Sequence, residues 1–308
     1  MDNPANTAKQ KKGILAGFLI LIALCIGFIV LVAVLPSGGS GHTSKDLAFG
    51  RGKIGVVEIF GPIMVSDQAV EQIQKYAEDD SIKAIIIRID SPGGAVAPSQ
   101  EIYNAVVKAR QKKKVVASMA TLAASGGYYI AVGADRIVAN PGTITGSIGV
   151  IMGFVDLQEL MKKIGVQGMA IKSGEFKDIG ANTRPFTEAD RKVLQSVIDD
   201  VYMQFVNAVA TGRKMDVAKV KSLADGRIYS GHQALELGMV DEMGGMTESV
   251  DITAKLAGIK GEPLLVKEKE KFNFIKELMS EKVATKFDWL ASEVSIHKPG
   301  IYYLWSMN

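Results

Sequence analysis

Residues 82–90 read IKAIIIRID, and residues 91–94, which follow directly, read SPGG. A nearly continuous run of β-branched residues is typical of a strand that is buried on both faces, as in a parallel sheet. Two adjacent glycines allow close approaches and backbone conformations that other residues cannot adopt. Ligand sites in α/β folds favour the carboxyl ends of strands. The segment therefore predicts a central strand that ends in a candidate functional loop, with an ordinary strand-to-helix turn as the alternative.

Strand-like and helix-like segments alternate on both sides of this run. Apolar residues at Ala69, Val70, Ile73 and Ala77 have helical spacing, and Thr187 with Asp190 resembles a capping box. The pattern predicts strands at 53–59, 115–119, 136–140, 148–152 and 169–172, and helices at 66–80, 98–112, 124–134, 156–165 and 187–211. This alternation indicates an α/β fold with largely parallel strand pairing.

The composition excludes several classes of protein. The chain has 308 residues and a formal net charge of 36 − 33 = +3, which is too close to neutral for a nucleic-acid-binding surface. Its single cysteine excludes an intrachain disulfide framework and a metal site built from cysteines. No metal or nucleotide motif occurs, so we expect neither a metal nor another cofactor.

The N-terminal region contains an uncharged apolar stretch of 23 residues, 13–35. At ~1.5 Å rise per residue, a helix of this length spans about 34 Å and can cross a bilayer. Lysines precede it, which predicts a cytoplasmic N-terminus (1–12) and an extracytoplasmic remainder. The alternative, a cleaved signal peptide, has a shorter apolar region and a small-residue cleavage site. Residues 36–52 then have the composition of a flexible linker.

Residues 123–129, AASGGYY, contain a candidate nucleophile. Ser125 is flanked by residues with little or no side chain, at the expected transition from a strand to a helix. A bulky substrate can therefore reach its hydroxyl, and the N–H group of Gly126 is placed to bind a developing oxyanion. The alternative is that Ser125 only caps the helix.

A serine hydroxyl needs a base to become nucleophilic, and the three histidines are poorly suited to that role. His42 lies in the linker, His297 lies near the C-terminus, and His232 lies at an apparent helix start. A lysine that burial keeps neutral can serve instead. Lys177 lies in a glycine-containing loop, but these considerations do not separate it from other lysines nearby, namely Lys162, Lys163 and Lys172.

Six motifs occur in a fixed order along the chain. They are IDSPGG (89–94), ASGGYY (124–129), GSIGV (146–150), SGEFKD (173–178), ADGRIYSG (224–231) and GMVD (238–241). Together they resemble the signal peptide peptidase A family of membrane-bound bacterial serine peptidases, in its short single-unit form. The resemblance covers roughly residues 53–250. It implies an α/β fold of the Clp-protease/crotonase-like spiral type, here preceded by one transmembrane helix, with a peptidase domain at 53–262.

The resemblance also implies roles for individual residues. Ser125 corresponds to the family nucleophile and Lys177 to its general base, while the backbone N–H groups of Gly94 and Gly126 correspond to the oxyanion donors. We interpret Ser147 as a hydroxyl that orients the lysine amine, with simple turn formation as the alternative. The implied substrates are signal-peptide remnants and other extended apolar peptides at the outer face of the cytoplasmic membrane. A homo-oligomer is implied as well.

The C-terminal segment, 263–308, matches the family motifs less clearly. It ends in IHKPGIYYLWSMN (296–308), which carries five consecutive apolar or aromatic residues at 301–305. We expect this tail to pack on a neighbouring subunit or to lie in the substrate groove as a self-ligand. Two other functions remain open, namely a crotonase-type acyl-CoA enzyme and a non-catalytic oligomeric membrane scaffold. The expected membrane anchor, the serine and the lysine weigh against the acyl-CoA enzyme, and the serine, the lysine and both glycine loops weigh against the scaffold.

Overall fold

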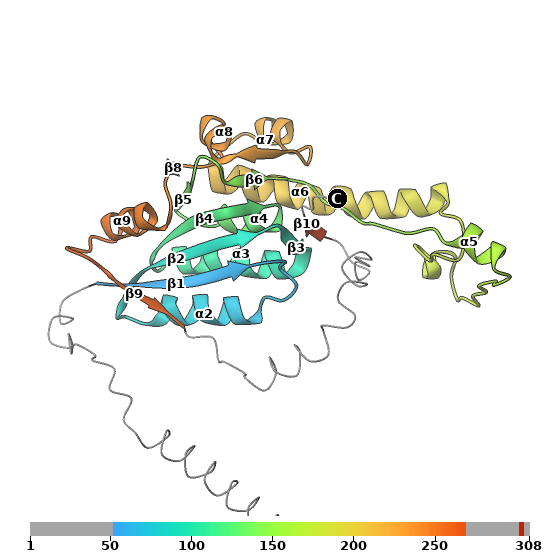
Figure 1. Ribbon diagram of the computed structural model, residues 1–308, viewed down its shortest axis with the longest axis horizontal. Coiled ribbons are helices and arrows are strands. Elements are labelled where there is room, and N and C mark those ends of the chain that lie inside the picture. The colour runs from blue at the N-terminus through green and yellow to red at the C-terminus, as the bar shows by residue number, and fades with distance from the viewer. Residues whose placement is uncertain (1–51, 269–301, 305–308) are drawn as a thin grey trace, which may run out of the picture. The chain divides into compact units, whose positions relative to one another are not determined.

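The computed structural model describes residues 52–268 and 302–304 (Figure 1). The expected anchor at 13–35, the cytoplasmic segment 1–12 and most of the linker 36–52 lie outside the described residues. Among the residues that are described, no helix is both long and apolar enough to cross a membrane.

A mostly parallel sheet forms the centre of the fold. Its first three strands are β1 (Lys53–Phe60), β2 (Ile82–Ser91) and β4 (Lys114–Ala124), and β2 pairs in parallel with both of the others. The strand expected at 136–140 is β5 (Arg136–Ala139), which pairs in parallel with β4. These four elements confirm the predicted strands, although β4 continues five residues beyond its expected end.

The remaining strands extend this sheet and make it mixed. They are β6 (Ile144–Gly146), β7 (Ile228–Ser230), β8 (Glu242–Met243) and β9 (Leu264–Lys267). The sheet order is β7-β6-β4-β2-β1-β9, with β5 and β8 branching from β4. Only the pair β6–β7 is antiparallel within this sheet.

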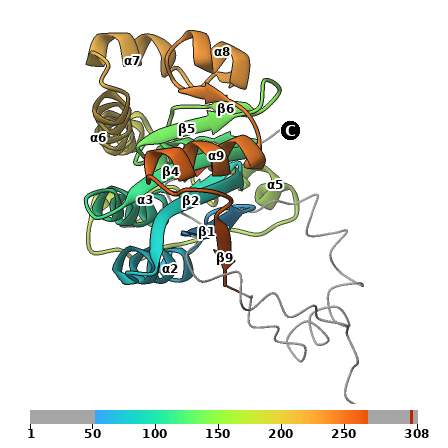
Figure 2. The same cartoon turned by 90° about the vertical axis from the view of Figure 1, so that its left-hand side faces the viewer.

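Helices cover both faces of the sheet, as Figure 2 shows. The helices α2 (Asp67–Glu78), α3 (Val96–Arg110) and α4 (Gly126–Ala131) pack on one face, and α9 (Met246–Leu256) packs on the other. Along β2, Ile85 and Ile87 contact the first group, while Ile86 contacts the α9 side. Both sets are buried, which explains why this strand lacks polar alternation.

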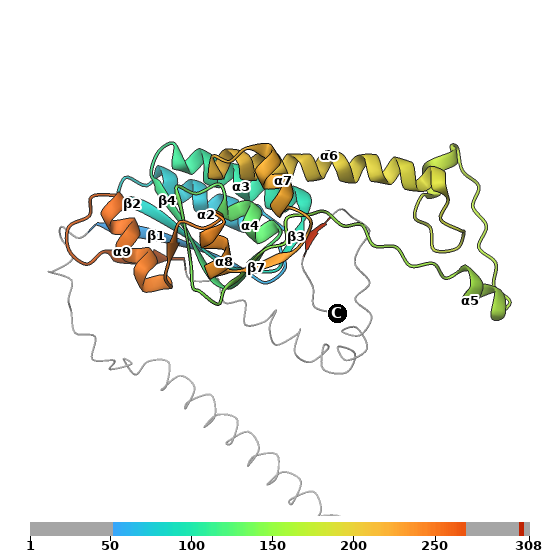
Figure 3. The same ribbon diagram turned by 90° about the horizontal axis from the view of Figure 1, so that it is seen from above.

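The long helix α6 (Glu188–Arg213) confirms the prediction at 187–211, including its capping box of Thr187 and Asp190. Its N-terminal half extends beyond the sheet, together with α5 (Gln158–Lys163) and the chain around it, in both Figure 1 and Figure 3. We call the segment 152–187 the arm. Two short helices, α7 (Val217–Leu223) and α8 (Gly231–Glu236), follow α6.

Two predicted strands are wrong. Residues 148–152 form no strand, because the ladder is made by β6 four residues earlier, and Ile151 makes only an isolated bridge to Tyr302. Residues 169–172 have no regular structure, and the side chains of Met169 and Ile171 are almost fully exposed. The apolar residues that predicted a strand therefore lie on the arm, where no other part of the described chain covers them. The helices expected at 124–134 and 156–165 are both shorter than predicted.

Candidate active site

Ser125 lies between the end of β4 and the start of α4, in a backbone conformation that serine rarely adopts. Its φ is +52° and its ψ is −115°. Its N–H donates to the Gly146 carbonyl oxygen at 2.8 Å, and its own carbonyl accepts from the N–H of Tyr129 at 2.8 Å. Such a conformation persists only where surrounding contacts impose it, and it occurs preferentially at functional sites.

Ser125 opens onto a cavity of about 490 Å³. Ser147 lines the same cavity, also at a positive φ of +50°, and its N–H donates to the carbonyl oxygen of Arg227. The helix α6 supplies one wall, with Gln195, Ile198, Asp199 and Tyr202. Among the described residues, none that lines this cavity is a lysine or a histidine.

The two expected oxyanion donors lie side by side next to Ser125. Gly94 belongs to a short strand, β3 (Gly93–Ala95), that follows β2 directly. A Cβ added to Gly126 would lie 3.2 Å from the Gly94 nitrogen, and one added to Gly93 would lie 2.6 Å from the Gly126 nitrogen. Such close approach is possible only because all three residues are glycines.

Hydrogen bonds between β3 and Ile63 determine the direction in which the Gly94 amide points. The Gly93 carbonyl accepts from the Ile63 N–H at 2.9 Å, and the Ala95 N–H donates to the Ile63 carbonyl at 2.8 Å. Because neighbouring residues of a strand direct their polar groups to opposite edges, the N–H and C=O of Gly94 point away from Ile63. That edge of β3 is therefore available to an extended peptide.

A segment of the same chain occupies this edge. The strand β10 (Tyr302–Leu304) is antiparallel to β3, with Tyr303 opposite Gly94. On its other side, Tyr302 exchanges two hydrogen bonds with Ile151, at 3.1 and 3.2 Å. A Cβ on Gly93 would lie 2.1 Å from the Tyr303 carbonyl oxygen. The Tyr303 carbonyl thus lies beside Gly93, on the edge of β3 that carries the Gly94 amide and close to the Gly126 nitrogen.

The Tyr303 side chain fills an aromatic pocket. Its ring stacks on Tyr129 at a centroid distance of 5.1 Å and lies 4.7 Å from the ring of Phe205. Its hydroxyl donates to the Val201 carbonyl oxygen at 3.1 Å. Burial raises the pKa of Tyr303 and raises that of Tyr129 to about 12, so both phenols stay neutral at physiological pH. The pocket accepts a large apolar ring with one hydroxyl.

Lys177 lies elsewhere, on a short 3₁₀ helix (Glu175–Asp178) of the arm. Its side chain is exposed, and it does not line the Ser125 cavity of its own chain. The neighbouring carboxylate of Asp178 is held by Lys172 at 2.7 Å and by Arg184 at 3.0 Å. Arg184 also binds Asp190 at the start of α6, so the loop that carries Lys177 is fastened to that helix.

The histidines do not supply a base within the described part of the chain. His232 is exposed on α8 and faces Glu236 at 3.9 Å. His42 and His297 lie outside the described residues. In 52–268 and 302–304, no group of three or more histidine, cysteine or acidic side chains is arranged to hold a metal ion.

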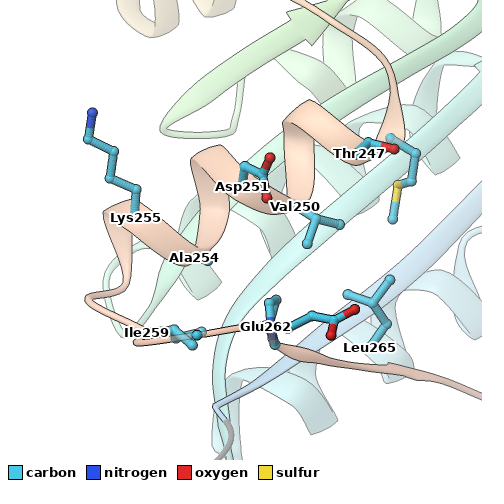
Figure 4. Close-up of a pocket in the computed structure, with 11 residues that line it drawn as sticks. Thr247, Val250, Asp251, Ala254, Lys255, Ile259, Glu262 and Leu265 are labelled. Carbon is cyan, nitrogen blue, oxygen red and sulfur yellow. The ribbon is translucent and has the colours of Figure 1, made fainter.

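A larger cavity of about 690 Å³ lies between α9 and β9 (Figure 4). Its lining is mainly apolar, with Asp251, Lys255 and Glu262 at the rim, and it contains none of the predicted site residues. The cavity at Ser125 is therefore the better candidate active site, although it is the smaller of the two.

Four of the five predicted site residues thus meet at the carboxyl ends of the strands, and Lys177 does not join them within one chain. The sequence analysis missed the wall that α6 supplies and the aromatic pocket at Phe205 and Val201. These residues have helical spacing only, which is the signal of an ordinary core face.

Comparisons with known proteins agree with this geometry. The family model described as peptidase family S49 matches residues 108–260, and the Clp protease model matches residues 57–142. A Synechocystis sp. protein with the provisional name of a protease is 48% identical over 68% of this chain and 76% of its own length. A Methanocaldococcus jannaschii protein with a similar provisional name is 37% identical over 79% and 81%. An Enterococcus faecium protein, provisionally named signal peptide peptidase SppA, is 36% identical over 69% of this chain and 62% of its own length.

Proposed function

The chain belongs to peptidase family S49, with a Clp protease-like α/β fold, and from this premise we propose that it is a membrane-anchored endopeptidase with a Ser–Lys dyad. The family is one of serine peptidases. In the proposed reaction, the amine of Lys177 removes the Ser125 proton as the hydroxyl attacks a peptide carbonyl. The resulting ammonium then protonates the leaving amine, and water hydrolyses the acyl-enzyme.

The single observation that carries the proposal is the extended peptide at β3. Tyr303 pairs with Gly94 on the edge of β3, its carbonyl oxygen lies beside Gly93, and Gly93 in turn lies close to the nitrogen of Gly126, the residue after Ser125. These are the parts that acyl transfer from a peptide requires, namely a nucleophile, a bound carbonyl and donors for the oxyanion. The acyl-CoA alternative explains neither the peptide-binding edge nor the family.

We infer that Lys177 reaches the Ser125 cavity of a neighbouring copy in a homo-oligomer. No lysine among the described residues lines the Ser125 cavity of its own chain, and the arm that carries Lys177 extends away from the sheet. The arm also exposes large apolar side chains, among them Val155, Leu160, Ile164, Met169 and Ile171. Large apolar side chains that are exposed in one short segment are typical of a protein–protein interface. In that arrangement, the hydroxyl of Ser147 orients the incoming amine.

The segment 13–35 is proposed as the anchor that holds the catalytic domain at the outer face of the cytoplasmic membrane. Apolar extended peptides, including signal-peptide remnants, emerge at that surface, and the aromatic pocket at Tyr129 and Phe205 suits such residues. Fractionation of cell membranes tests the anchor, and protease treatment of intact cells tests on which side of the membrane the catalytic domain lies. The proposal predicts that removal of residues 1–36 releases the protein in soluble form.

We propose that 302–304 is a self-ligand that competes with substrate for the β3 edge. The antiparallel pairing with Gly94 and the fit of Tyr303 to its pocket support this choice over simple packing on a neighbour. A chain that ends at residue 298 is then expected to show a lower KM for a peptide substrate, with kcat little changed. An unchanged KM, with the same oligomer mass, would contradict the self-ligand.

Single substitutions test the dyad. Ser125→Ala and Lys177→Ala are each expected to abolish cleavage of an unfolded apolar peptide, because the proposed mechanism needs both the nucleophile and its base. Lys163→Ala, an exposed lysine of α5, is the matched control and is expected to retain activity. Turnover near the wild-type rate in either dyad variant would refute the mechanism, and an inactive wild type would favour the scaffold.

A further inference from the structure

Ser91 is a buried serine that takes no part in the proposed chemistry. It is the last residue of β2, and its side chain is inaccessible to solvent. Its hydroxyl donates to the Gly61 carbonyl oxygen at 2.7 Å and accepts from the Gly93 N–H at 3.1 Å. One hydroxyl therefore connects two loops and satisfies a polar group in each of them.

Both loops determine where the Gly94 amide lies. The Gly61 loop leads to Ile63, whose N–H and C=O bind the residues on either side of Gly94. Gly93 lies at the turn from β2 into β3, and its N–H is the group that donates to Ser91. The hydroxyl of Ser91 thus connects Gly93, the residue before Gly94, to the Gly61 loop, which flanks Gly94.

The residue before Ser91 connects the same region to the nucleophile. The Asp90 carboxylate accepts from the Leu122 N–H at 3.0 Å, three residues before Ser125, and the Asp90 carbonyl accepts from the Gly61 N–H at 2.9 Å. The end of β2 is therefore hydrogen-bonded to β4, which leads to Ser125 and Gly126, and to the Gly61 loop, which flanks Gly94.

We propose that Ser91 is a positioning residue that sets the distance between the two oxyanion donors, the amides of Gly94 and Gly126. This inference rests on the proposed acyl transfer at Ser125. Without the hydroxyl, the buried Gly93 N–H and the Gly61 C=O each lose a hydrogen-bond partner. The backbone from Ser91 to Gly94 then shifts to form other hydrogen bonds. The oxyanion then meets a displaced Gly94 amide, whereas the pocket at Tyr129 and Phe205 still binds a side chain of the extended peptide. The substitution therefore affects kcat more than KM.

The test compares Ser91→Ala with Ser118→Ala in the full chain. Ser118 is an equally buried serine of β4 whose hydroxyl accepts from Arg88 at 2.9 Å and contacts the Ser249 hydroxyl at 2.7 Å. It does not line the Ser125 cavity, so it controls for the loss of a buried hydrogen-bonded hydroxyl. Since removal of a whole oxyanion donor typically lowers kcat about 10²–10³-fold, a displaced donor in Ser91→Ala is expected to lower it about 10- to 100-fold. KM should stay within about twofold, and Ser118→Ala should keep kcat within about twofold of the wild type.

A peptide aldehyde gives a second readout, because its adduct with Ser125 places an oxygen between the two donors. Its affinity should fall in Ser91→Ala in parallel with kcat, while the affinity of the corresponding peptide alcohol stays constant. Should Ser91→Ala fail to fold, Ser91→Cys retains the size with a weaker hydrogen bond and is expected to give an intermediate kcat.

Two results overturn the inference and leave the proposed function standing. They are a wild-type kcat in Ser91→Ala or Ser91→Cys, and an equal loss of kcat in Ser91→Ala and Ser118→Ala. Full activity of Ser125→Ala would instead refute the proposed function itself, so the two failures are distinguishable.

Discussion

At the scale of single residues, Gly93 occupies a position where a side chain has no room. Its φ is +95°, and an added Cβ would lie 2.1 Å from one backbone oxygen and 2.6 Å from the Gly126 nitrogen. Both obstacles are backbone atoms, so no side-chain rotation relieves them. A glycine here is therefore a requirement of the peptide-binding edge as well as of the turn.

Gly93→Ala is expected to lower kcat/KM about 100-fold or more, because the new methyl group occupies the space beside the substrate carbonyl and displaces an oxyanion donor. Gly258→Ala is the matched control. Gly258 also has a positive φ, +68°, but an added Cβ there has nothing within 4 Å. Steady-state kinetics with one peptide substrate compare the two. The explanation fails if both variants lose activity equally.

At the scale of elements, α6 connects three parts of the site. Its first turn holds Arg184 through Asp190, its middle lines the Ser125 cavity, and its last residue, Arg213, binds Asp241 through two hydrogen bonds of 2.8 and 2.9 Å. Arg213 also donates to the Gly238 carbonyl. The C-terminal end of the helix is therefore fixed to the sheet, which lets the other end extend outward as a rigid support for the arm.

This ion pair predicts a dependence of stability on pH. Burial by itself would raise the pKa of Asp241, but hydrogen bonds from Arg213 and from the Ile137 N–H, with the charge of Arg213, hold it below its ordinary value of 3.8. A lowered carboxyl pKa stabilises the fold above the pKa of the unfolded chain, and this contribution disappears as the pH falls through the lower folded value.

We therefore expect the free energy of unfolding to decrease below about pH 4, and Asp241→Asn to weaken that decrease. Arg213→Met should cost roughly 2–4 kcal/mol at neutral pH, because it leaves a half-buried carboxylate without its cation. Urea unfolding at several pH values measures both effects. Parallel pH profiles for the wild type and Asp241→Asn would exclude the ion pair as their cause.

The sequence analysis predicted the elements that local patterns determine. The β-branched run of β2 and the capping box of α6 both carry their signals within a few residues, and the glycine motifs were expected at strand ends. The C-terminal tail was expected to pack on a neighbouring subunit or to lie in the substrate groove, but its pairing with β3 was not predictable, because Tyr303 lies about 200 residues further along the chain. The apolar residues of the arm at 169–172 were misinterpreted as a strand. An apolar pattern suggests that residues are covered, but it does not indicate whether their own chain covers them.

At the scale of the whole molecule, the proposed homo-oligomer makes the arm and the Ser125 cavity complementary parts of one site. The arm exposes apolar side chains and carries a lysine, while the described residues that line the cavity include a serine but no lysine. A heterologous contact, in which the arm of each copy reaches the next, generates a closed ring if the rotation closes.

Met169→Asp is expected to dissociate the oligomer and abolish cleavage without unfolding the chain, because Met169 is 94% exposed in the single copy. Val217→Asp, at an exposed apolar residue on the first turn of α7, serves as the control and should leave the oligomer intact. Sedimentation velocity and thermal melting follow the two properties separately. An unchanged mass for Met169→Asp would exclude this surface as the interface.

Complementation between inactive chains tests the shared active site most directly. Ser125→Ala and Lys177→Ala chains, coexpressed in equal amounts, are predicted to recover about a quarter of wild-type peptidase activity, since random mixing joins an intact serine to an intact lysine at that fraction of heterologous interfaces. Each variant alone should remain inactive. Mixed oligomers that stay as inactive as their parents would contradict the account.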